Sequence, residues 1–435
     1  MVPSLTFGFE AVMTILVVLW VLCIKPEYGL FLYGLTLGFP DVALPLGTTI
    51  NIRLDDGVML FFLLRSVLWT PAPLAAGQRK ILSWQVVLFS VCVFSAVYKF
   101  ASGAPPEAYV TAKMIGCAAI LFVLPRLVQS ERRLRFLIVG LLCGGIALAI
   151  QIVQHLGANS AEATKNFQVY KSAAAFTTWN PNTIGQAAML AVFTAGVGWI
   201  GFAGSRVARI IWPCFAVGFA LIPAMMFVRG TSLSIAAGFV LFLCLSRRWK
   251  WVLLFLAVCV AVVLYLRTAN RTLADGAFNV DLTTGEGLSD RYARWGSAIQ
   301  AIERNPFLGQ GFGQEWSYLQ NAGSEGRAHD AYLTVWIELG LGGLLLFLAT
   351  IVQFFRAGWS LYVNPRYQMQ GALIVSLIFA LVLDSFGLST LYWEKLPTIA
   401  MSLAVVVVGL CKRMDQEVEV SEIPTLSYEP FRQHS

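Results

Sequence analysis

The sequence has 435 residues, of which 57% are hydrophobic and only 13% are charged, and its mean hydropathy is +0.70. Soluble globular domains carry about 25% charged residues, so this composition excludes an ordinary soluble protein. The net charge of +7 does not indicate a nucleic-acid partner, because the distribution of the basic residues is more informative than their sum.

Thirteen apolar runs follow one another along the chain, and several reach or approach the roughly 20 residues that cross a bilayer core. We interpret them as helices, because the alternating ten-residue strands of a membrane barrel are not found. The runs cover residues 7–24, 28–46, 57–70, 81–101, 108–125, 134–156, 184–203, 207–228, 232–246, 251–266, 331–355, 369–388 and 396–411. The expected fold is an all-α polytopic membrane protein with about 12–13 transmembrane helices and one long extracytoplasmic loop containing short helices.

Basic residues fall in the loops after every second run, and such loops stay in the cytoplasm. The clusters are Arg79/Lys80, Arg126 with Arg132/Arg133/Arg135, Arg206/Arg209, Arg247/Arg248/Lys250, Arg356/Arg366 and Lys412/Arg413. This regularity predicts that the stretches 155–183, 229–231, 267–330 and 389–395 lie on the opposite, extracytoplasmic side. Thirteen spans would put the N-terminus outside, whereas twelve would put it inside.

The chain is expected to have three parts. Residues 1–157 form N-terminal transmembrane helices, residues 158–411 form a second transmembrane domain, and residues 412–435 form a disordered cytoplasmic tail of mixed charge. The second domain contains the long hydrophilic loop 267–330, and loops of this length are usually functional. This loop is therefore the first place to search for a site.

One segment of the long loop, residues 289–304, has the pattern of a helix. Ser289 is a suitable N-cap, and Tyr292, Trp295, Ile299 and Ile302 fall on one stripe. Asn305-Pro306 is expected to end it. The glycines that follow, at positions 309, 311 and 313, resemble part of a dinucleotide fingerprint, but no βαβ unit surrounds them, so we expect a turn.

The predicted outer face is unusually basic, which suggests an anionic ligand. Its cations are Lys165, Lys171, Arg229, Arg267, Arg271, Arg291, Arg294, Arg304 and Arg327. Guanidinium groups match phosphate oxygens, so a lipid diphosphate at the outer leaflet is one candidate, and plain lipid head-group contact or solvation is the other. Arg229 is the most informative, because apolar spans flank it on both sides and an unpaired charge there would be costly.

His329 closes the long loop directly before a membrane helix. Histidine titrates near neutrality, so it can take a proton from a hydroxyl nucleophile, and Asp330 could orient it or cap the helix. No metal site is expected. All eight cysteines lie in apolar segments without Cys-x-x-Cys spacing, and Asp55-Asp56 is more typical of a helix cap than of a metal ligand pair.

Several short blocks together resemble the O-antigen ligase and O-antigen polymerase superfamily, roughly over residues 180–345. The blocks are Asn180-Pro181-Asn182, Arg229-Gly230, Arg291-Tyr292-Ala293-Arg294-Trp295, Asn305-Pro306-Phe307-Leu308-Gly309-Gln310-Gly311, His329-Asp330-Ala331-Tyr332-Leu333 and Glu338-Leu339-Gly340. The resemblance implies a helical glycosyltransferase in the bacterial inner membrane. Such an enzyme takes glycan from an undecaprenyl-diphosphate carrier at the periplasmic face, without metal, nucleotide sugar or other cofactor.

The same resemblance assigns roles to residues. His329 matches the family's essential histidine, the catalytic base, and Arg229 and Arg291 match its diphosphate-binding arginines. Asn182 and Asp330 complete the expected substrate-binding set. The family usually has Asn after the histidine, and Asp330 would either favour the imidazolium form of His329 or mark a different acceptor. The expected partners are the carrier-linked glycan, an acceptor glycolipid or glycan, and membrane lipids.

Two other functions remain open at this point. One is an O-antigen or exopolysaccharide polymerase on the same carrier. The other is a transporter of bicarbonate or another small anion, which predicts charges deep in the spans, with Arg65 and Lys113 as candidates. The glycosyltransferase interpretation predicts a cavity open to the outer leaflet and lined by Arg229, Arg291 and His329.

Overall fold

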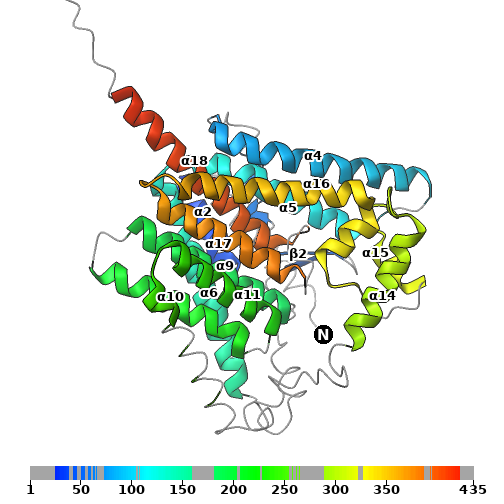
Figure 1. Cartoon of the computed structure of the whole chain (residues 1–435), viewed down its shortest axis with the longest axis horizontal. Helices are drawn as coiled ribbons and strands as arrows, with labels where there is room; N and C mark the ends of the chain where they lie inside the picture. The colour runs from blue at the N-terminus through cyan, green and yellow to red at the C-terminus, as the bar shows by residue number, and fades with distance from the viewer. Residues whose placement is uncertain are drawn as a thin grey trace, which may run out of the picture.

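The computed structural model describes residues 25–38, 43–46, 50–53, 73–103, 108–158, 181–202, 206–225, 228–253, 289–321, 327–386 and 394–421, with a few single residues between them. Within these ranges the chain is a bundle of apolar helices (Figure 1). Six of the helices are long and apolar enough to cross a membrane. The expected all-α polytopic membrane fold is confirmed.

The helices agree with most of the predicted runs to within a few residues, because each run ends where charged or loop-forming residues begin. They are α2 (Pro26–Thr36), α4 (Ala76–Ala101), α5 (Ala108–Leu127), α6 (Glu131–Ala158), α9 (Pro181–Phe202), α10 (Arg206–Met225), α11 (Arg229–Leu245), α14 (Ser289–Arg304), α15 (Glu315–Asn321), α16 (Ala331–Tyr362), α17 (Gln368–Asp384) and α18 (Lys395–Ser421). The helix predicted inside the long loop is thus present as α14.

The second predicted span differs from the structure. The helix α2 has only 11 residues, about 16 Å at 1.5 Å per residue, which is too short for a core of about 30 Å. It is followed by a small antiparallel hairpin of β1 (Ala43–Leu46) and β2 (Ile50–Arg53). Pro45 lies in β1 and has no N–H for a helical hydrogen bond, which explains why the apolar run is not one helix. The first predicted span, 7–24, lies outside the described residues.

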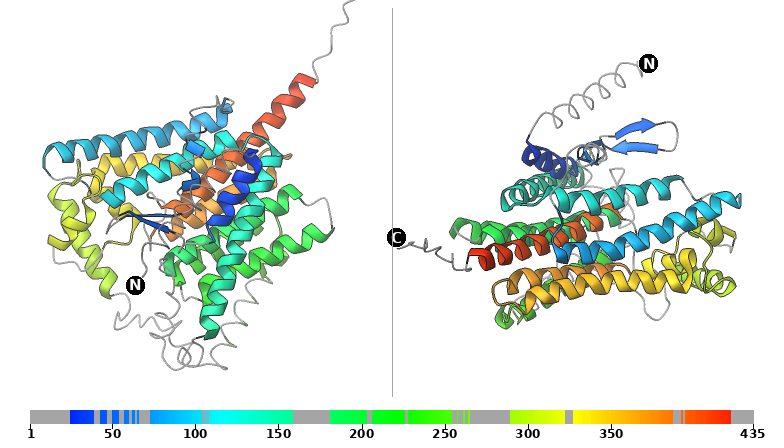
Figure 2. Two further views of the ribbon diagram at one scale, coloured as in Figure 1. Left: turned by 180° about the vertical axis from the view of Figure 1, so that it is seen from behind. Right: turned by 90° about the horizontal axis from the view of Figure 1, so that it is seen from above.

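Paired glycines set the closest helix contact in the N-terminal part. Gly34 of α2 and Gly38, just after α2, face Gly140 and Gly144 of α6, and a Cβ atom added to any of them would overlap backbone atoms of the opposite segment. Small residues four apart allow two membrane helices to approach until their backbones touch. The short helix α2 therefore packs closely against α6, and Figure 2 shows the two helices side by side.

The basic ends of the helices lie together at one end of the bundle. Arg413 of α18 donates to the carbonyl oxygens of Gln129 and Pro73, 3.1 and 3.3 Å away, which lie beside the ends of α5 and α4. Tyr362 at the end of α16 donates to the carbonyl of Leu245 at the end of α11, at 3.2 Å. The basic ends of α4, α5, α11, α16 and α18 thus lie at one end of the bundle.

The other end of the bundle gathers the starts of α5, α11, α16 and α18 and the end of α17. Lys113 of α5 forms an ion pair with Glu394. Thr231 of α11 donates to Asp384 of α17, at 2.8 Å between the two oxygens. The short helices α14 and α15 cover the start of α16 at this end, opposite the projecting end of α18 (Figures 1 and 2). These contacts lie at the end of the bundle away from the basic clusters, and the assignment of this end to the periplasm remains a prediction.

The predicted disordered tail is wrong in its first ten residues. The last helix, α18, continues without a break to Ser421, well beyond the apolar run that ends at Cys411. Residues 412–421 contain no proline or glycine, so nothing in the sequence stops the helix after its apolar part ends. Residues 422–435 lie outside the described part of the chain.

The helix α16 is broken at Gly340, whose φ of 69° lies in the left-handed region. The break frees backbone carbonyls, and the loop between α14 and α15 pairs with them. The N–H groups of Gln310 and Gly311 donate to the carbonyls of Ile337 and Glu338, at 2.6 and 2.9 Å. In the other direction, Leu341 N–H donates to the Pro306 carbonyl at 2.8 Å.

Three glycines make this loop possible. Gly309, Gly311 and Gly313 all have positive φ, a conformation that costs other residues about 1–2 kcal/mol. A Cβ atom at position 309 would lie 2.6 Å from the carbonyl oxygen of Glu338. The predicted turn is confirmed, and its glycines serve close contact with the broken helix.

We predict that Gly340→Ala lowers the unfolding free energy by about 2–5 kcal/mol, because the substitution combines left-handed strain with overlap of the Phe307 carbonyl. The measurement is thermal denaturation of the purified protein in detergent. Gly342→Ala is the matched control on the same helix: nothing lies within 4 Å of its added Cβ, so its stability should be unchanged or slightly higher. Equal denaturation midpoints for Gly340→Ala and the wild type would contradict this account of the break.

Candidate active site

His329 lies in the short segment between α15 and α16, with a φ of 51°. A residue other than glycine in this region carries strain of about 1–3 kcal/mol, and such strain persists only where the surroundings hold it. The side chain is half-buried. A strained histidine beside a membrane helix is a strong candidate for a functional residue.

Three hydrogen bonds hold the backbone on either side of His329. The N–H of Ala328 donates to Glu315 Oε1 at 3.0 Å, and the carbonyl of Ala328 accepts from Trp295 Nε1 at 3.1 Å. On the other side, Ala331 N–H donates to the Ser385 carbonyl at 3.0 Å. Because α14, α15 and α17 each contribute one bond, the conformation of His329 depends on the tertiary structure.

Asp330 is the N-cap of α16. Its Oδ1 atom accepts from the backbone N–H groups of Tyr332 and Leu333, both at 2.9 Å, and the residue is only 6% exposed. Burial raises the pKa of this carboxyl above its usual value, while the two backbone bonds act in the opposite direction. The structure thus bears out capping, one of the two roles considered for Asp330, and contact with a substrate remains a prediction.

His329 is surrounded by positive charge. Burial lowers the pKa of its imidazole below 6.5, and the guanidinium groups of Arg294, Arg291 and Arg327 lower it further. The imidazole is therefore neutral at physiological pH, which is the form that accepts a proton. Arg291 and Arg294 stand on neighbouring turns of α14, so one helix contributes two cations to this site.

Arg229 and Asn182 lie at the same end of the bundle as His329. Arg229 is the first residue of α11 and is exposed, two residues before Thr231, which binds Asp384. Asp384 is next to Ser385, whose carbonyl binds the start of α16. Asn182 is half-buried at the start of α9, one turn before the point where α9 closely contacts Thr231. All five predicted site residues are thus near one junction of helix ends.

Sequence reasoning overlooked the buried carboxylates that support this junction. Glu315 is 2% exposed and holds Ala328, and Glu338 is 2% exposed and accepts from Tyr392 Oη at 2.9 Å. Glu338 could have been found, because a lone acidic residue inside the apolar run 331–355 needs a partner. Glu315 gave no such signal, since it stands in a hydrophilic loop where acidic residues are ordinary.

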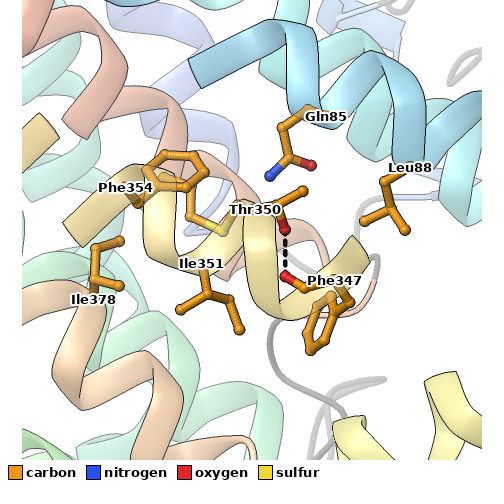
Figure 3. Close-up of a pocket in the computed structure, with 8 residues that line it drawn as sticks. Gln85, Leu88, Phe347, Thr350, Ile351, Phe354 and Ile378 are labelled. Carbon is orange, nitrogen blue, oxygen red and sulfur yellow. Dashed lines mark hydrogen bonds between the residues drawn. The ribbon is translucent and has the colours of Figure 1, made fainter. Parts of the chain in front are cut away.

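Two small cavities lie between the described helices, and neither is the expected one. Figure 3 shows a small, mainly apolar cavity between α4, α16, α17 and α18, lined by Gln85, Thr350, Ile378 and Met401 among others. A second cavity lies between α9, α17 and α18 and is also mainly apolar. Neither includes Arg229, Arg291 or His329 in its lining, so the convergence of these three side chains on one cavity remains a prediction.

Comparison with known proteins supports the assignment of this region. Residues 214–348 match the family described as O-antigen ligase, a range that includes Arg229, α14, the glycine loop, His329 and the break in α16. No curated protein matches the chain. The order of the matched elements agrees with the resemblance found in the short sequence blocks. Residues 214–348 are thus similar to O-antigen ligases, and they lie in a multi-pass membrane protein whose described part has six helices long and apolar enough to cross a membrane.

Proposed function

We propose that the protein transfers a glycan from undecaprenyl diphosphate to an acceptor hydroxyl at the periplasmic face of a bacterial inner membrane, with His329 as the general base. One observation carries the proposal. His329 is held in a left-handed conformation among arginines that lower its pKa, at the end of the bundle opposite the basic clusters. By the positive-inside rule that end faces away from the cytoplasm.

The reaction needs one proton acceptor and one stabilised leaving group. The imidazole of His329 takes the proton of the acceptor hydroxyl, whose oxygen forms a bond to the anomeric carbon of the donor sugar. The bond between that carbon and the diphosphate oxygen breaks, and undecaprenyl diphosphate leaves with the electron pair. General base catalysis of this kind typically contributes about 10²–10⁴-fold.

The arginines have two roles in this scheme. Arg291 and Arg229 bind the diphosphate through charge-assisted hydrogen bonds, and Asn182 can donate an amide hydrogen bond to the same substrate. Without substrate, burial, Arg294 and Arg291 lower the pKa of the imidazole and so favour its neutral form. A bound diphosphate offsets their charge and so raises the basicity of His329 when the donor is in place. Because guanidinium groups supply the positive charge, the scheme requires no metal ion.

The contacts of the two candidate deep charges favour this enzyme over an anion transporter. Lys113 is paired with Glu394 at the end of the bundle, and Arg65 lies close enough to Glu27 and Arg133 to interact electrostatically with both. A paired cation near a helix end, such as Lys113, is typical of a structural ion pair. A transport path needs charged groups that can exchange partners with a passing ion.

We predict that His329→Ala lowers transfer by about 10³-fold, and that Arg229→Ala and Arg291→Ala each lower it by about 10²-fold. The assay uses purified protein in proteoliposomes with a lipid-diphosphate glycan and candidate acceptors. Arg304→Ala is the matched control, since it removes an exposed arginine from the last turn of the same helix as Arg291. Full activity in a folded His329→Ala protein would exclude the proposed base.

Products of the same reconstitution separate a ligase from a polymerase. A ligase yields glycan attached to the acceptor and leaves the donor length unchanged, whereas a polymerase yields longer carrier-linked chains. Accumulation of solute inside the vesicles, unaffected by His329→Ala, would instead support the transporter.

The pH dependence follows from the pKa of His329. Activity should fall on the acid side as the imidazole becomes protonated, with a midpoint below that of an ordinary histidine, because burial and the nearby arginines disfavour the charged form. Arg294→Gln removes one positive neighbour, so the pKa rises and the acid limb of the kcat/KM profile moves to higher pH. Arg304→Gln should leave the limb in place. An acid limb that Arg294→Gln does not move would show that another group controls it.

Substitutions at Asp330 separate capping from substrate contact. Asn keeps a side-chain acceptor for the N–H groups of Tyr332 and Leu333, so Asp330→Asn should preserve stability, whereas Asp330→Ala should lower it by about 1 kcal/mol. Thermal denaturation measures this difference. A large loss of transfer in the Asn variant at unchanged stability would show that the carboxylate also contacts a substrate.

A further inference from the structure

Glu315 is the first residue of α15 and is almost completely buried. Its Oε1 atom accepts two hydrogen bonds of 3.0 Å, one from Ala328 N–H and one from Thr334 Oγ1. The Thr334 hydroxyl also lies 2.8 Å from the Asp330 carbonyl oxygen, so its one proton is shared between that carbonyl and Glu315. One carboxylate therefore joins α15, the segment before His329 and the first turn of α16.

A buried carboxylate is costly unless hydrogen bonds compensate it. A membrane protein that needed only to pack α15 on α16 would do so with apolar contacts, as Leu319 on the next turn of α15 does. Unlike an apolar side chain, the Glu315 carboxylate accepts a hydrogen bond, and so it fixes the direction of a backbone N–H. That N–H belongs to the residue directly before His329, where the left-handed turn begins.

A second buried acidic side chain, Glu338, holds the backbone at the start of α15. Glu338 lies within hydrogen-bonding reach of the backbone N–H groups of Gly313 and Glu315, and it accepts from Tyr392 Oη. The start of α15 is thereby tied to α16 at the break next to Gly340. The position of Glu315 is thus set by the helix break, and the position of Ala328 is set by Glu315.

We propose that Glu315 is the positioning residue of the catalytic histidine, holding Ala328 N–H so that the imidazole of His329 stays partly buried beside α14. The proposal rests on the proposed function in taking His329 as the base. Glu315 touches neither substrate, and it acts through the backbone.

The charged groups around His329 make a sign test possible. Arg291 and Arg294 face it from α14, Arg327 and Asp330 flank it in its own segment, and Glu315 lies behind it on α15. Arg229 and Asp384 stand at the same end of the bundle. If Glu315 acted only by its negative charge, removing it would lower the pKa of His329. If it acts by position, removing it releases His329 from burial, and the pKa rises toward that of a solvated histidine.

The experiment measures carbethoxylation of His329 by diethylpyrocarbonate, which reacts with neutral imidazole, in purified full-length protein in nanodiscs. Peptide mass spectrometry follows the rate at His329 between pH 5 and pH 8, on the scale of about 6.5 for an ordinary histidine. His434 serves as an internal reference for the reagent. The proteins compared are the wild type, Glu315→Ala, Glu315→Gln and Glu315→Asp. No glycan substrate is needed.

Glu315→Gln keeps an acceptor oxygen at the same reach, so its midpoint should equal that of the wild type or lie slightly lower. Glu315→Ala loses the acceptor and Glu315→Asp shortens the reach by one methylene, so both midpoints should move to higher pH and both plateau rates should rise. If Glu315→Ala does not fold, the Asp variant carries the test. In the transfer assay the same two variants should lose on the order of 100-fold in kcat with little change in KM.

Unchanged midpoints and plateau rates in folded Ala and Asp variants would overturn the positioning role, as would a midpoint that moves to lower pH. This outcome differs from failure of the proposed function, which appears as transfer that survives His329→Ala. A protein can fail one test and pass the other, because carbethoxylation reports the surroundings of His329 whether or not it is the base.

Discussion

The backbone carbonyls freed at the break in α16 must accept hydrogen bonds from elsewhere in the protein, and the rest of this region depends on that constraint. Inside a membrane protein, a carbonyl freed from its helix has no water to bind, so it must find a donor in the protein. The N–H groups of Gln310 and Gly311 are those donors. The loop between α14 and α15 is therefore anchored to a membrane helix by main-chain hydrogen bonds, which do not depend on any exposed side chain.

A series of hydrogen bonds connects this loop to His329, the candidate base. Glu338 and the broken helix locate the start of α15, Glu315 then locates Ala328, and Ala328 precedes the strained His329. Trp295 of α14 completes the arrangement by binding the carbonyl of Ala328. The strain at His329 is thus supported by polar side chains of α14 and α15 that bind the backbone of Ala328.

Several arginines make this end of the bundle positively charged. Arg291 and Arg294 come from α14, Arg327 from the segment before His329, and Arg229 from the start of α11. Burial, Arg294, Arg291 and Arg327 together lower the pKa of the His329 imidazole. In the proposed function, a lipid diphosphate brings the opposite charge, so arginines that bound the donor would also link donor binding to the proton affinity of His329.

The sequence by itself determined the membrane class, most helix boundaries and α14, because hydropathy and charge alternation are local properties of the chain. Its short motifs also proposed His329, Arg229 and Arg291 as site residues. It did not reveal the hairpin that interrupts the run 28–46. Only the tertiary structure decided that Asp330 caps α16 and that Glu315 holds Ala328. The physical reason is that a buried carboxylate is recognised by its partners, and the partners of Glu315 become neighbours only after α14, α15 and the broken α16 have packed together.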